Sequence, residues 1–365
     1  MKLKVPPSKS ITQRALLISH IAGGKVTNPL LSDDTKHMIK ALKNLKSPIF
    51  VGNAGTAMRF LTAYLTLTDF KGTITGNKHM QKRPIKELVN ALNKLGAKVS
   101  TKNGCPPVHV EGAKGLKGGK VRIKGNISSQ YISAILMVAP YAEKDVVIEV
   151  IGNLASKPYV DLTIDVMKAF GVHVKNKNYK RFTVKTGQKY KTRKFKVEGD
   201  ASSATYFWAI SHLTGRKIDI TNISKNSKQG DIKFKSLLKK LQKRIDLNDM
   251  PDTMPLVAAL CALKKGKRKM VNIANLRIKE CDRIEAMRNE LKKLGIKTKS
   301  GKDWLEVEGA PDKIRPVKIE TYNDHRIAMT FAALKTKYPK IEITGKSCVS
   351  KSYPNFWKDY KRITK

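Results

Sequence analysis

The residues of this sequence that could do chemistry are cations grouped at expected helix starts and one carboxylate suited to proton transfer. Lys9, Ser10 and Arg14 place two cations and a hydroxyl on one face of a helix start, a geometry that suits a phosphate or a carboxylate. Arg326 ends the segment Asn-Asp-His-Arg ahead of an apolar stretch, and its guanidinium could bind the same groups bidentately. Asp252 follows Met-Pro and precedes an apolar stretch without lysine, so it is a candidate buried carboxylate and general base.

Each of these groups also has an ordinary structural interpretation. Asp282 and Arg283, in the segment Lys-Glu-Cys-Asp-Arg, could form a surface ion pair that contributes little to stability. His325 is more typical of a structural residue than of a catalytic one, and a single serine or aspartate at a helix start is usually only a cap. The neighbouring residues favour a binding site, because Arg59 and Gln130 follow two further polar helix starts.

Stretches that lack lysine and arginine indicate the buried helices that must position these groups. Lysine and arginine make up 73 of 365 residues, so a stretch without them is conspicuous. Most such stretches open with serine, threonine, asparagine or aspartate, which cap helix starts and leave backbone N–H groups available to an anion. They are residues 15–24, 60–70, 131–142, 205–213 and 254–263.

A second class of helix recurs along the chain and predicts the fold class. It is amphipathic and rich in lysine, and it ends in Leu-Gly or Phe-Gly at Gly96, Gly171 and Gly295, where a left-handed residue is favoured. The clear copies are residues 87–100, 162–175 and 285–299, and weaker copies are residues 38–51 and 234–246. This spacing is too long for a solenoid and indicates an α/β (α+β) fold made from a few repeated units.

Composition and charge exclude several classes of protein. With 41% hydrophobic residues, the 365 positions can build a core in two domains or in one large domain. The 73 Lys and Arg against 29 Asp and Glu give a net charge of +44, which suggests an anionic partner. No apolar run approaches the roughly 18 residues of a membrane span, and the N-terminus lacks a secretory signal, so we expect a cytoplasmic protein without membrane contact.

Motifs for several other chemistries do not occur in the sequence. The four cysteines are scattered without Cys-x-x-Cys spacing, which favours reduced thiols and no bound metal. The P-loop, the Gly-x-Ser-x-Gly elbow and the His-Glu-x-x-His motif have no match, so nucleotide hydrolysis, serine hydrolysis and zinc chemistry lack support. The residues by themselves predict a soluble α/β protein with a cation-rich pocket for small polyanions at helix starts.

Ten segments, collinear over essentially the whole chain, resemble the 3-phosphoshikimate 1-carboxyvinyltransferases, also called EPSP synthases. They are PSKSITQRALL, GNAGTAMRFL, QKRPIKELVNALNKLGA, GNISSQYISAILM, ASKPYVDLT, VEGDASSATYF, LNDMPDTMPL, NLRIKECDRI, TYNDHRIAMTFAAL and VSKSYPNFW. The resemblance implies transfer of the enolpyruvyl group of phosphoenolpyruvate to the 5-hydroxyl of shikimate 3-phosphate, with release of phosphate, in chorismate and aromatic amino acid biosynthesis. It also implies that no metal or organic cofactor is needed.

The same resemblance implies a two-lobed, inside-out α/β barrel, with three repeated βαβαββ units in each lobe and helix N-termini facing the cleft. Residues 8–196 would form the lobe that binds mainly shikimate 3-phosphate. Residues 1–7 with 197–365 would form the second lobe, which would carry the catalytic carboxylates and the cations that bind phosphoenolpyruvate. The chain would cross between the lobes near Pro7 and near Lys196.

The motif positions also imply which residues bind and react. The catalytic residues would be Asp252, which orients and deprotonates the 5-hydroxyl, Glu280, which protonates the methylene carbon, and Lys9. Ligands of shikimate 3-phosphate would be Lys9, Ser10, Arg14, Ser128, Ser129, Gln130, Ser156, Tyr159, Asp252, Asn275 and Lys279. Ligands of phosphoenolpyruvate would be Lys9, Gly55, Arg83, Gln130, Arg283, Arg326 and Lys351. Because Gly55 is retained, the resemblance implies that glyphosate competes with phosphoenolpyruvate.

Two other functions remain open from the sequence. The related enzyme that transfers enolpyruvate to UDP-N-acetylglucosamine carries a reactive cysteine in its closing loop, whereas residues 77–84 here contain Arg83 and no cysteine. A basic nucleic-acid-binding protein should interleave aromatic residues with cations, yet aromatic residues are only 7%. We therefore expect a monomer whose partners are the two small anionic substrates, with no specific nucleic acid.

Overall fold

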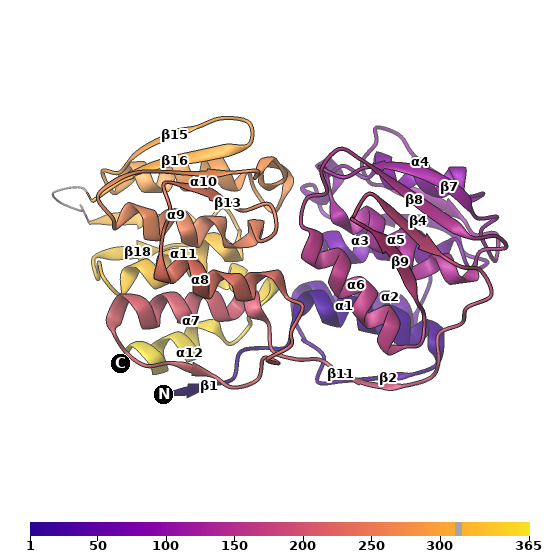
Figure 1. Cartoon of the computed structure of the whole chain (residues 1–365), viewed down its shortest axis with the longest axis horizontal. Coiled ribbons are helices and arrows are strands. Elements are labelled where there is room, and N and C mark those ends of the chain that lie inside the picture. Colours follow the sequence, from indigo (N-terminus) through magenta and orange to yellow (C-terminus); the bar gives the residue numbers. More distant parts are fainter. Residues whose placement is uncertain (311–315) are drawn as a thin grey trace. The chain divides into compact units, whose positions relative to one another are not determined.

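The computed structural model describes residues 1–310 and 316–365, which fall into two compact units (Figure 1). The continuous unit is Pro7–Glu198. The split unit joins Met1–Pro6 to Gly199–Lys365. Each unit has its own hydrophobic core of buried aliphatic and aromatic side chains.

The residues at the two crossings between the units differ slightly from the expected ones. Pro7, Val197 and Glu198 belong to the continuous unit, although the sequence placed them in the other lobe. Backbone hydrogen bonds give the reason. The Ser8 amide donates to the Glu198 carbonyl over 2.8 Å, and the Val197 amide donates to the Thr27 carbonyl over 3.0 Å.

The continuous unit contains two four-stranded sheets and one parallel pair of strands. Its helices are α1 Lys9–Ala22, α2 Asp33–Lys43, α3 Gly55–Leu65, α4 Lys86–Lys94, α5 Ser129–Val138 and α6 Lys157–Ala169, with short 3-10 turns η1 Met80–Lys82 and η2 Ala139–Tyr141. Its strands are β2 Lys25–Thr27, β3 Ile49–Phe50, β4 Lys71–Thr75, β5 Lys98–Thr101, β6 Val108–Glu111, β7 Gly119–Lys124, β8 Val146–Ile151, β9 Val174–Lys177, β10 Arg181–Val184 and β11 Lys194–Lys196. The sheet orders are β3-β4-β6-β5, β7-β8-β10-β9 and β11-β2.

Among its described residues, the split unit has one four-stranded sheet of the same kind and two parallel pairs of strands. Its helices are α7 Ala201–Thr214, α8 Phe234–Lys239, α9 Met254–Ala262, α10 Arg283–Lys293, α11 His325–Lys335 and α12 Phe356–Thr364, with 3-10 turns η3 Gly230–Lys233, η4 Pro251–Thr253, η5 Ala274–Ile278 and η6 Lys346–Lys351. Its strands are β1 Lys2–Leu3, β12 Asp219–Ile220, β13 Arg244–Asp246, β14 Gly266–Val271, β15 Lys297–Ser300, β16 Trp304–Gly309, β17 Val317–Ile319 and β18 Ile341–Ile343. The sheet orders are β13-β14-β16-β15, β1-β12 and β17-β18.

In the part of the chain that the structure describes, one order of strands and helices occurs three times, in β3 to β6, β7 to β10 and β13 to β16. In each copy the first two strands pair in parallel across a helical connection, and the last two form an antiparallel hairpin. Strand β7 shows why one sheet face is buried: Val121 and Ile123 are buried, while Lys120, Arg122 and Lys124, which alternate with them, are exposed. The α/β class predicted from the sequence is confirmed by these sheets and helices.

Helices of the two predicted classes also form. The lysine-poor helices α5 and α9 are buried along almost their whole length, and α5 packs on α3 and α6 (Figure 1). The amphipathic helices α4, α6 and α10 are each followed by a glycine in the left-handed region. These are Gly96 at φ 97°, Gly171 at φ 88° and Gly295 at φ 85°, as their positions in the sequence predicted.

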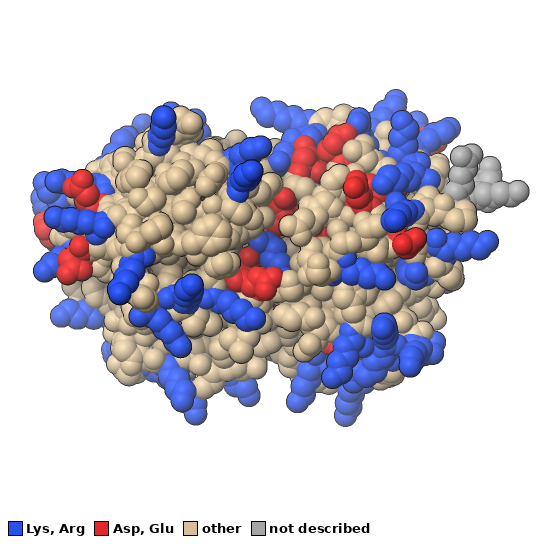
Figure 2. All heavy atoms as spheres, turned by 180° about the vertical axis from the view of Figure 1, so that it is seen from behind, with Lys and Arg blue, Asp and Glu red and all other residues tan. Residues whose placement is uncertain are grey.

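The cationic side chains are distributed over the surface. On the face shown in Figure 2, lysines and arginines lie scattered among neutral side chains, with fewer carboxylates between them. Within the described residues, no helix is both long and apolar enough to cross a membrane.

Candidate active site

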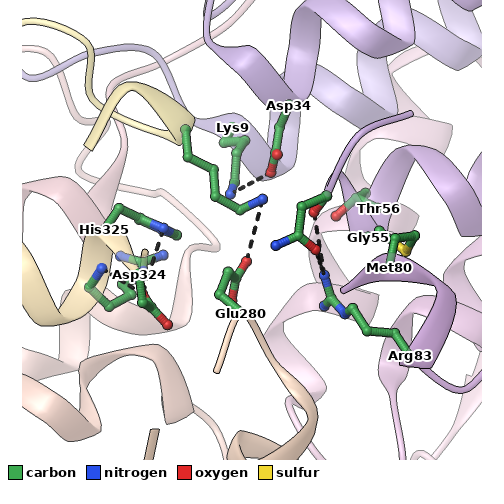
Figure 3. Close-up of polar contacts among 12 residues, drawn as sticks. Lys9, Asp34, Gly55, Thr56, Met80, Arg83, Glu280, Asp324 and His325 are labelled. Atoms are coloured by element: carbon green, nitrogen blue, oxygen red, sulfur yellow. Dashed lines mark hydrogen bonds and ion pairs between the residues drawn. The ribbon is translucent and has the colours of Figure 1, made fainter. Parts of the chain in front are cut away.

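The start of α1 holds a lysine that is already paired with an acid. Ser8 caps the helix and accepts a hydrogen bond from the Ile11 amide. The Lys9 ammonium lies 3.0 Å from Asp34 Oδ2 at the start of α2, and both side chains are largely buried (Figure 3). Asp34 therefore fixes the direction of the Lys9 side chain and offsets part of the cost of burying its charge.

Arg14, one turn further along α1, is held by internal partners. Its guanidinium donates to Thr163 Oγ1 over 2.7 Å, to the carbonyls of Ser10 and Tyr159 over 2.8 and 2.9 Å, and to Ser133 Oγ over 3.3 Å. These bonds occupy four of its five N–H donors and tie α1 to α5 and α6. Burial lowers the pKa of Arg14 to about 10, which leaves it cationic at neutral pH. Arg14 therefore holds α1 against α5 and α6 within the continuous unit.

Gly55 begins α3 and lies against a guanidinium. A Cβ at Gly55 would lie 2.8 Å from both terminal nitrogens of Arg83, so only glycine allows this approach. Arg83 Nη1 donates weakly to the Asn53 carbonyl and side chain, each at 3.4 Å, and the arginine is almost fully buried (Figure 3). The glycine and the arginine expected to bind phosphoenolpyruvate are therefore in direct contact.

A second buried arginine holds this arrangement in place. Arg59 donates to the Gly55 carbonyl over 3.0 Å and to the Pro84 carbonyl over 2.8 Å, and the Tyr131 hydroxyl donates to the same Pro84 carbonyl over 2.6 Å. Burial, with the nearby charge of Arg83, lowers the pKa of Arg59 to about 10. Arg59 thereby links the start of α3 to the segment that carries Arg83.

The starts of α5 and α6 supply the remaining expected ligands of this unit. Ser128 caps α5 and accepts from the Gln130 amide, and the Gln130 side chain donates to Thr56 Oγ1 over 3.2 Å at the start of α3. Ser129 is the first residue of α5 and is nearly buried. Ser156 precedes α6 with φ 60°, a left-handed value that is uncommon for serine and often marks a functional position.

In the split unit, Arg283 is the centre of a cluster of carboxylates. It is the first residue of α10 and is only 1% exposed. Its Nη1 donates to Asp252 over 2.8 Å, its Nη2 to Glu280 over 2.7 Å, and its Nε to Asp324 over 2.8 Å. The three carboxylates raise the pKa of Arg283 against the opposing effect of burial, so the guanidinium stays charged.

Asp252 lies between two arginines. Its Oδ1 accepts from Arg283, and its Oδ2 accepts from Arg326 Nη2 over 3.0 Å. Burial disfavours its ionised form, but the charges of Arg326, Arg283 and Lys279 together lower the pKa of Asp252 below its ordinary range. Asp252 is therefore a carboxylate throughout the pH range in which enzymes are assayed.

The other expected residues of the split unit lie around this cluster. The Lys351 ammonium, at the end of η6, is 3.8 Å from Glu280 Oε1, so Glu280 is flanked by two cations, Lys351 and Arg283. Asn275 is nearly buried within η5, and Lys279 directly follows that turn. The structure thus brings five of the expected residues together, namely Asp252, Glu280, Arg283, Arg326 and Lys351.

Comparison with known proteins decides the family. The family model described as EPSP synthase (3-phosphoshikimate 1-carboxyvinyltransferase) matches residues 1–51, 46–246 and 239–360. The chain belongs to the EPSP synthase family. The family predicted from the ten sequence segments is therefore confirmed.

Relatives of this EPSP synthase family member are similar over its full length. The 3-phosphoshikimate 1-carboxyvinyltransferase of Sulfurovum sp. (strain NBC37-1) is 40% identical over 413 positions, covering 100% of this chain and 96% of the relative. That of Mannheimia succiniciproducens is 40% identical over 417 positions, with 99% and 96% coverage. A solved EPSP synthase from Acinetobacter baumannii superposes with a TM-score of 0.79 at 25% identity, covering 100% of this chain and 95% of that one. Because this chain has 365 residues, the alignment with the Sulfurovum relative contains insertions that this family member lacks.

Three carboxylates of this family member were not predicted as site residues. Asp34 pairs with Lys9, and Asp324 binds Arg283 while capping α11. Asp231 accepts a hydrogen bond from Ser202, and burial, with the nearby charge of Asp252, raises its pKa to about 7. Asp324 could be recognised from the sequence as a helix cap. No local signal in the sequence indicates the contacts of these carboxylates with Lys9, Arg283 and Ser202.

The cysteine beside the cluster is protonated. Cys281 Sγ lies 3.5 Å from Asp324 Oδ2, and burial together with the charge of Asp324 raises the pKa of this thiol far above neutral. All four cysteines are free, as the sequence predicted. Among the described residues, no group of histidine, cysteine, aspartate or glutamate side chains could hold a metal ion.

Proposed function

We propose that this chain catalyses the reaction of its family, in which the enolpyruvyl group of phosphoenolpyruvate moves to the 5-hydroxyl of shikimate 3-phosphate and inorganic phosphate is released. The observation that carries this proposal is Asp252 held between Arg283 and Arg326, an ionised acid beside two buried cations. The reaction needs an acceptor for the hydroxyl proton and positive charge for a phosphate and a carboxylate.

The continuous unit would bind mainly shikimate 3-phosphate. Its helix starts expose backbone N–H groups and serine hydroxyls, which suit a phosphate and the oxygens of a sugar acid. Asp252, Asn275 and Lys279 of the split unit would contribute further contacts. The proposed ligands of the continuous unit are Lys9, Ser10, Arg14, Ser128, Ser129, Gln130, Ser156 and Tyr159.

Phosphoenolpyruvate would be bound by cations of both units. Arginine forks bind a carboxylate and a phosphate bidentately, and the glycine at the start of α3 lets one fork approach the helix backbone closely. Lysine contributes a point charge. The proposed ligands are Lys9, Gly55, Arg83, Gln130, Arg283, Arg326 and Lys351.

The proposed chemistry is an addition followed by an elimination. Asp252 orients the 5-hydroxyl and takes its proton as that oxygen forms a bond to C2 of phosphoenolpyruvate, while Glu280 delivers a proton to C3. Loss of a proton from C3 then reforms the double bond as the C2–O bond to phosphate breaks. Lys9 and the arginines stabilise the charge that develops on the leaving phosphate.

We also propose the finer architecture and setting implied by the family. Each unit would be one lobe of an inside-out barrel, with the parallel pairs β11-β2, β1-β12 and β17-β18 as shortened copies of the four-stranded sheets. The gaps in the alignment with the Sulfurovum relative support such shortening. The enzyme would be a cytoplasmic monomer that needs no cofactor.

Phosphate release by the purified protein tests the proposal. The reaction should require shikimate 3-phosphate and phosphoenolpyruvate together, and UDP-N-acetylglucosamine should not replace the acceptor. Moderate salt suppresses adventitious binding of anions to a chain with net charge +44. Glyphosate should inhibit in competition with phosphoenolpyruvate. A folded sample that releases no phosphate from the two substrates would refute the proposed activity.

A further inference from the structure

A fully buried carboxylate outside the proposed substrate ligands anchors the turn that leads into the arginine cluster. Glu290 lies on α10 two turns after Arg283, and its side chain has no exposed surface. Its Oε1 accepts from the Tyr322 hydroxyl over 2.8 Å, and its Oε2 accepts from the Glu320 amide over 3.0 Å. Lys293 completes the shell, with its ammonium 2.8 Å from the same Oε2.

The turn that Glu290 holds has an unfavourable backbone conformation. Tyr322 and Asn323, between β17 and α11, both have φ 52°, in the left-handed region. Outside glycine this conformation is uncommon, and it persists only where the surroundings determine it. The hydrogen bonds from Glu320 and Tyr322 to Glu290 fix the backbone conformation at the start of the turn.

The far end of the same turn is held by the other end of α10. Asp324, which follows the two left-handed residues, accepts from Arg283 Nε over 2.8 Å and caps α11 through the Arg326 amide. Arg326 in turn binds Asp252. Two side chains of α10 therefore hold the turn, Glu290 at the start of the turn and Arg283 at its end.

We infer that Glu290 is a positioning residue that sets where Asp324 and Arg326 stand, and thereby the affinity for phosphoenolpyruvate. The inference rests on the proposed function for its substrate. The reason for keeping a carboxylate here is directional: it accepts an N–H and an O–H from the turn and an ammonium N–H from Lys293 of its own helix, which an apolar side chain could not do.

The variant Glu290→Gln tests this, with Glu285→Gln as its matched control. Glu285→Gln makes the same chemical change on the same helix. The ion-pair partner of Glu285 is Arg288, which is not part of the turn. We expect at least a tenfold rise in KM for phosphoenolpyruvate in Glu290→Gln, with KM for shikimate 3-phosphate changed less than about threefold. Glu285→Gln should change neither constant by more than about twofold.

Amide hydrogen exchange supplies a readout that does not depend on activity. In Glu290→Gln, exchange at Asp324 to Ala328 should be at least tenfold faster, while Glu285→Gln leaves it unchanged. Equal behaviour of the two variants would overturn the inference. Faster exchange throughout the split unit, in step with a lower free energy of unfolding, would also overturn it, because the role would then be purely structural.

Two further outcomes are covered: Glu290→Gln does not fold, or the wild-type protein shows no turnover. If Glu290→Gln does not fold, Tyr322→Phe removes one of the three hydrogen bonds, and it should raise KM for phosphoenolpyruvate about threefold and speed the same amides. If the wild-type protein shows no turnover while these amides respond as expected, the proposed function fails and the anchoring of the turn stands.

Discussion

Arg283 Nη1 donates to Asp252 Oδ1 over 2.8 Å, and this bond joins the start of α10 to the turn before α9. It places the proposed base beside a guanidinium that also holds Glu280 and Asp324. A proton on Asp252 would weaken this bond, so the positive charges of the cluster favour the ionised form of the carboxylate.

Replacing Asp252 with asparagine should abolish most of the activity while the protein stays folded. The amide keeps the shape of the side chain but loses the charge that Arg283 and Arg326 face. We expect phosphate release to fall by about 10² to 10⁴, the range attributed to a general base. The control is Asp249→Asn, which removes a loose 3.8 Å pair with Lys233 and should leave activity within about twofold.

Replacing Glu280 with alanine should stop proton delivery to C3. The measurement is the entry of deuterium at C3 of phosphoenolpyruvate during incubation with shikimate 3-phosphate in heavy water. We expect exchange to fall by on the order of 100-fold. Exchange at the wild-type rate would show that another group supplies the proton, and Lys351, 3.8 Å from Glu280, would be the next residue to replace.

Replacing Gly55 with alanine should weaken phosphoenolpyruvate binding more than it weakens folding. The new methyl group would lie 2.8 Å from the Arg83 guanidinium, which must move. We expect KM for phosphoenolpyruvate to rise about tenfold or more, by the effect of misplacing a positioning cation. Gly115→Ala is the control, since its Cβ would meet nothing closer than 4.0 Å, and an equal rise there would argue against this explanation.

Asp231 should make the folded protein less stable as the pH rises. Its pKa is raised from 3.8 to about 7, first by burial and then by the charge of Asp252. Between these values the folded state holds a proton that the unfolded chain has released, so this contribution to the free energy of unfolding is lost as the pH increases. Relative to Asp231→Asn, the wild type should lose roughly 1 to 4 kcal/mol between pH 5 and pH 8 in urea unfolding.

The control for this pH dependence is Asp219→Asn, which changes an exposed aspartate of the same unit. It should show the same slope of stability against pH as the wild type. A wild-type slope identical to that of Asp231→Asn would mean that Asp231 is ionised in the folded protein at neutral pH.

Replacing Arg14 with lysine should destabilise the continuous unit. Lysine cannot reproduce the fork that reaches Thr163, Ser133 and the Tyr159 carbonyl, so buried acceptors would be left without a donor. We expect the free energy of unfolding to fall by about 1–3 kcal/mol in urea titrations. Arg122→Lys, which alters a mostly exposed pair with Glu149, should change it by less than about 0.5 kcal/mol.

The local features of the protein were determined by the sequence itself. The glycines after α4, α6 and α10 adopt the left-handed conformation that their positions predicted, because that preference is a property of the residue and its helix end. The lysine-poor stretches became buried helices for an equally local reason, the lack of charged side chains that would need water. The family followed from ten short segments in order, none of which depends on knowing the fold.

Only the tertiary structure decided which charged groups face one another. Arg14 donates a hydrogen bond to Thr163, 149 residues away, and Arg326 donates one to Asp252, 74 residues away. Asp324 was recognisable as a helix cap, but its bond to Arg283 spans 41 residues, and nothing near either residue indicates it. The same holds for Glu290, which in the sequence is one acid among lysines on an amphipathic helix. Caps and periodicity act over a few residues, whereas pairing of buried charges depends on how distant segments pack, which no local pattern encodes.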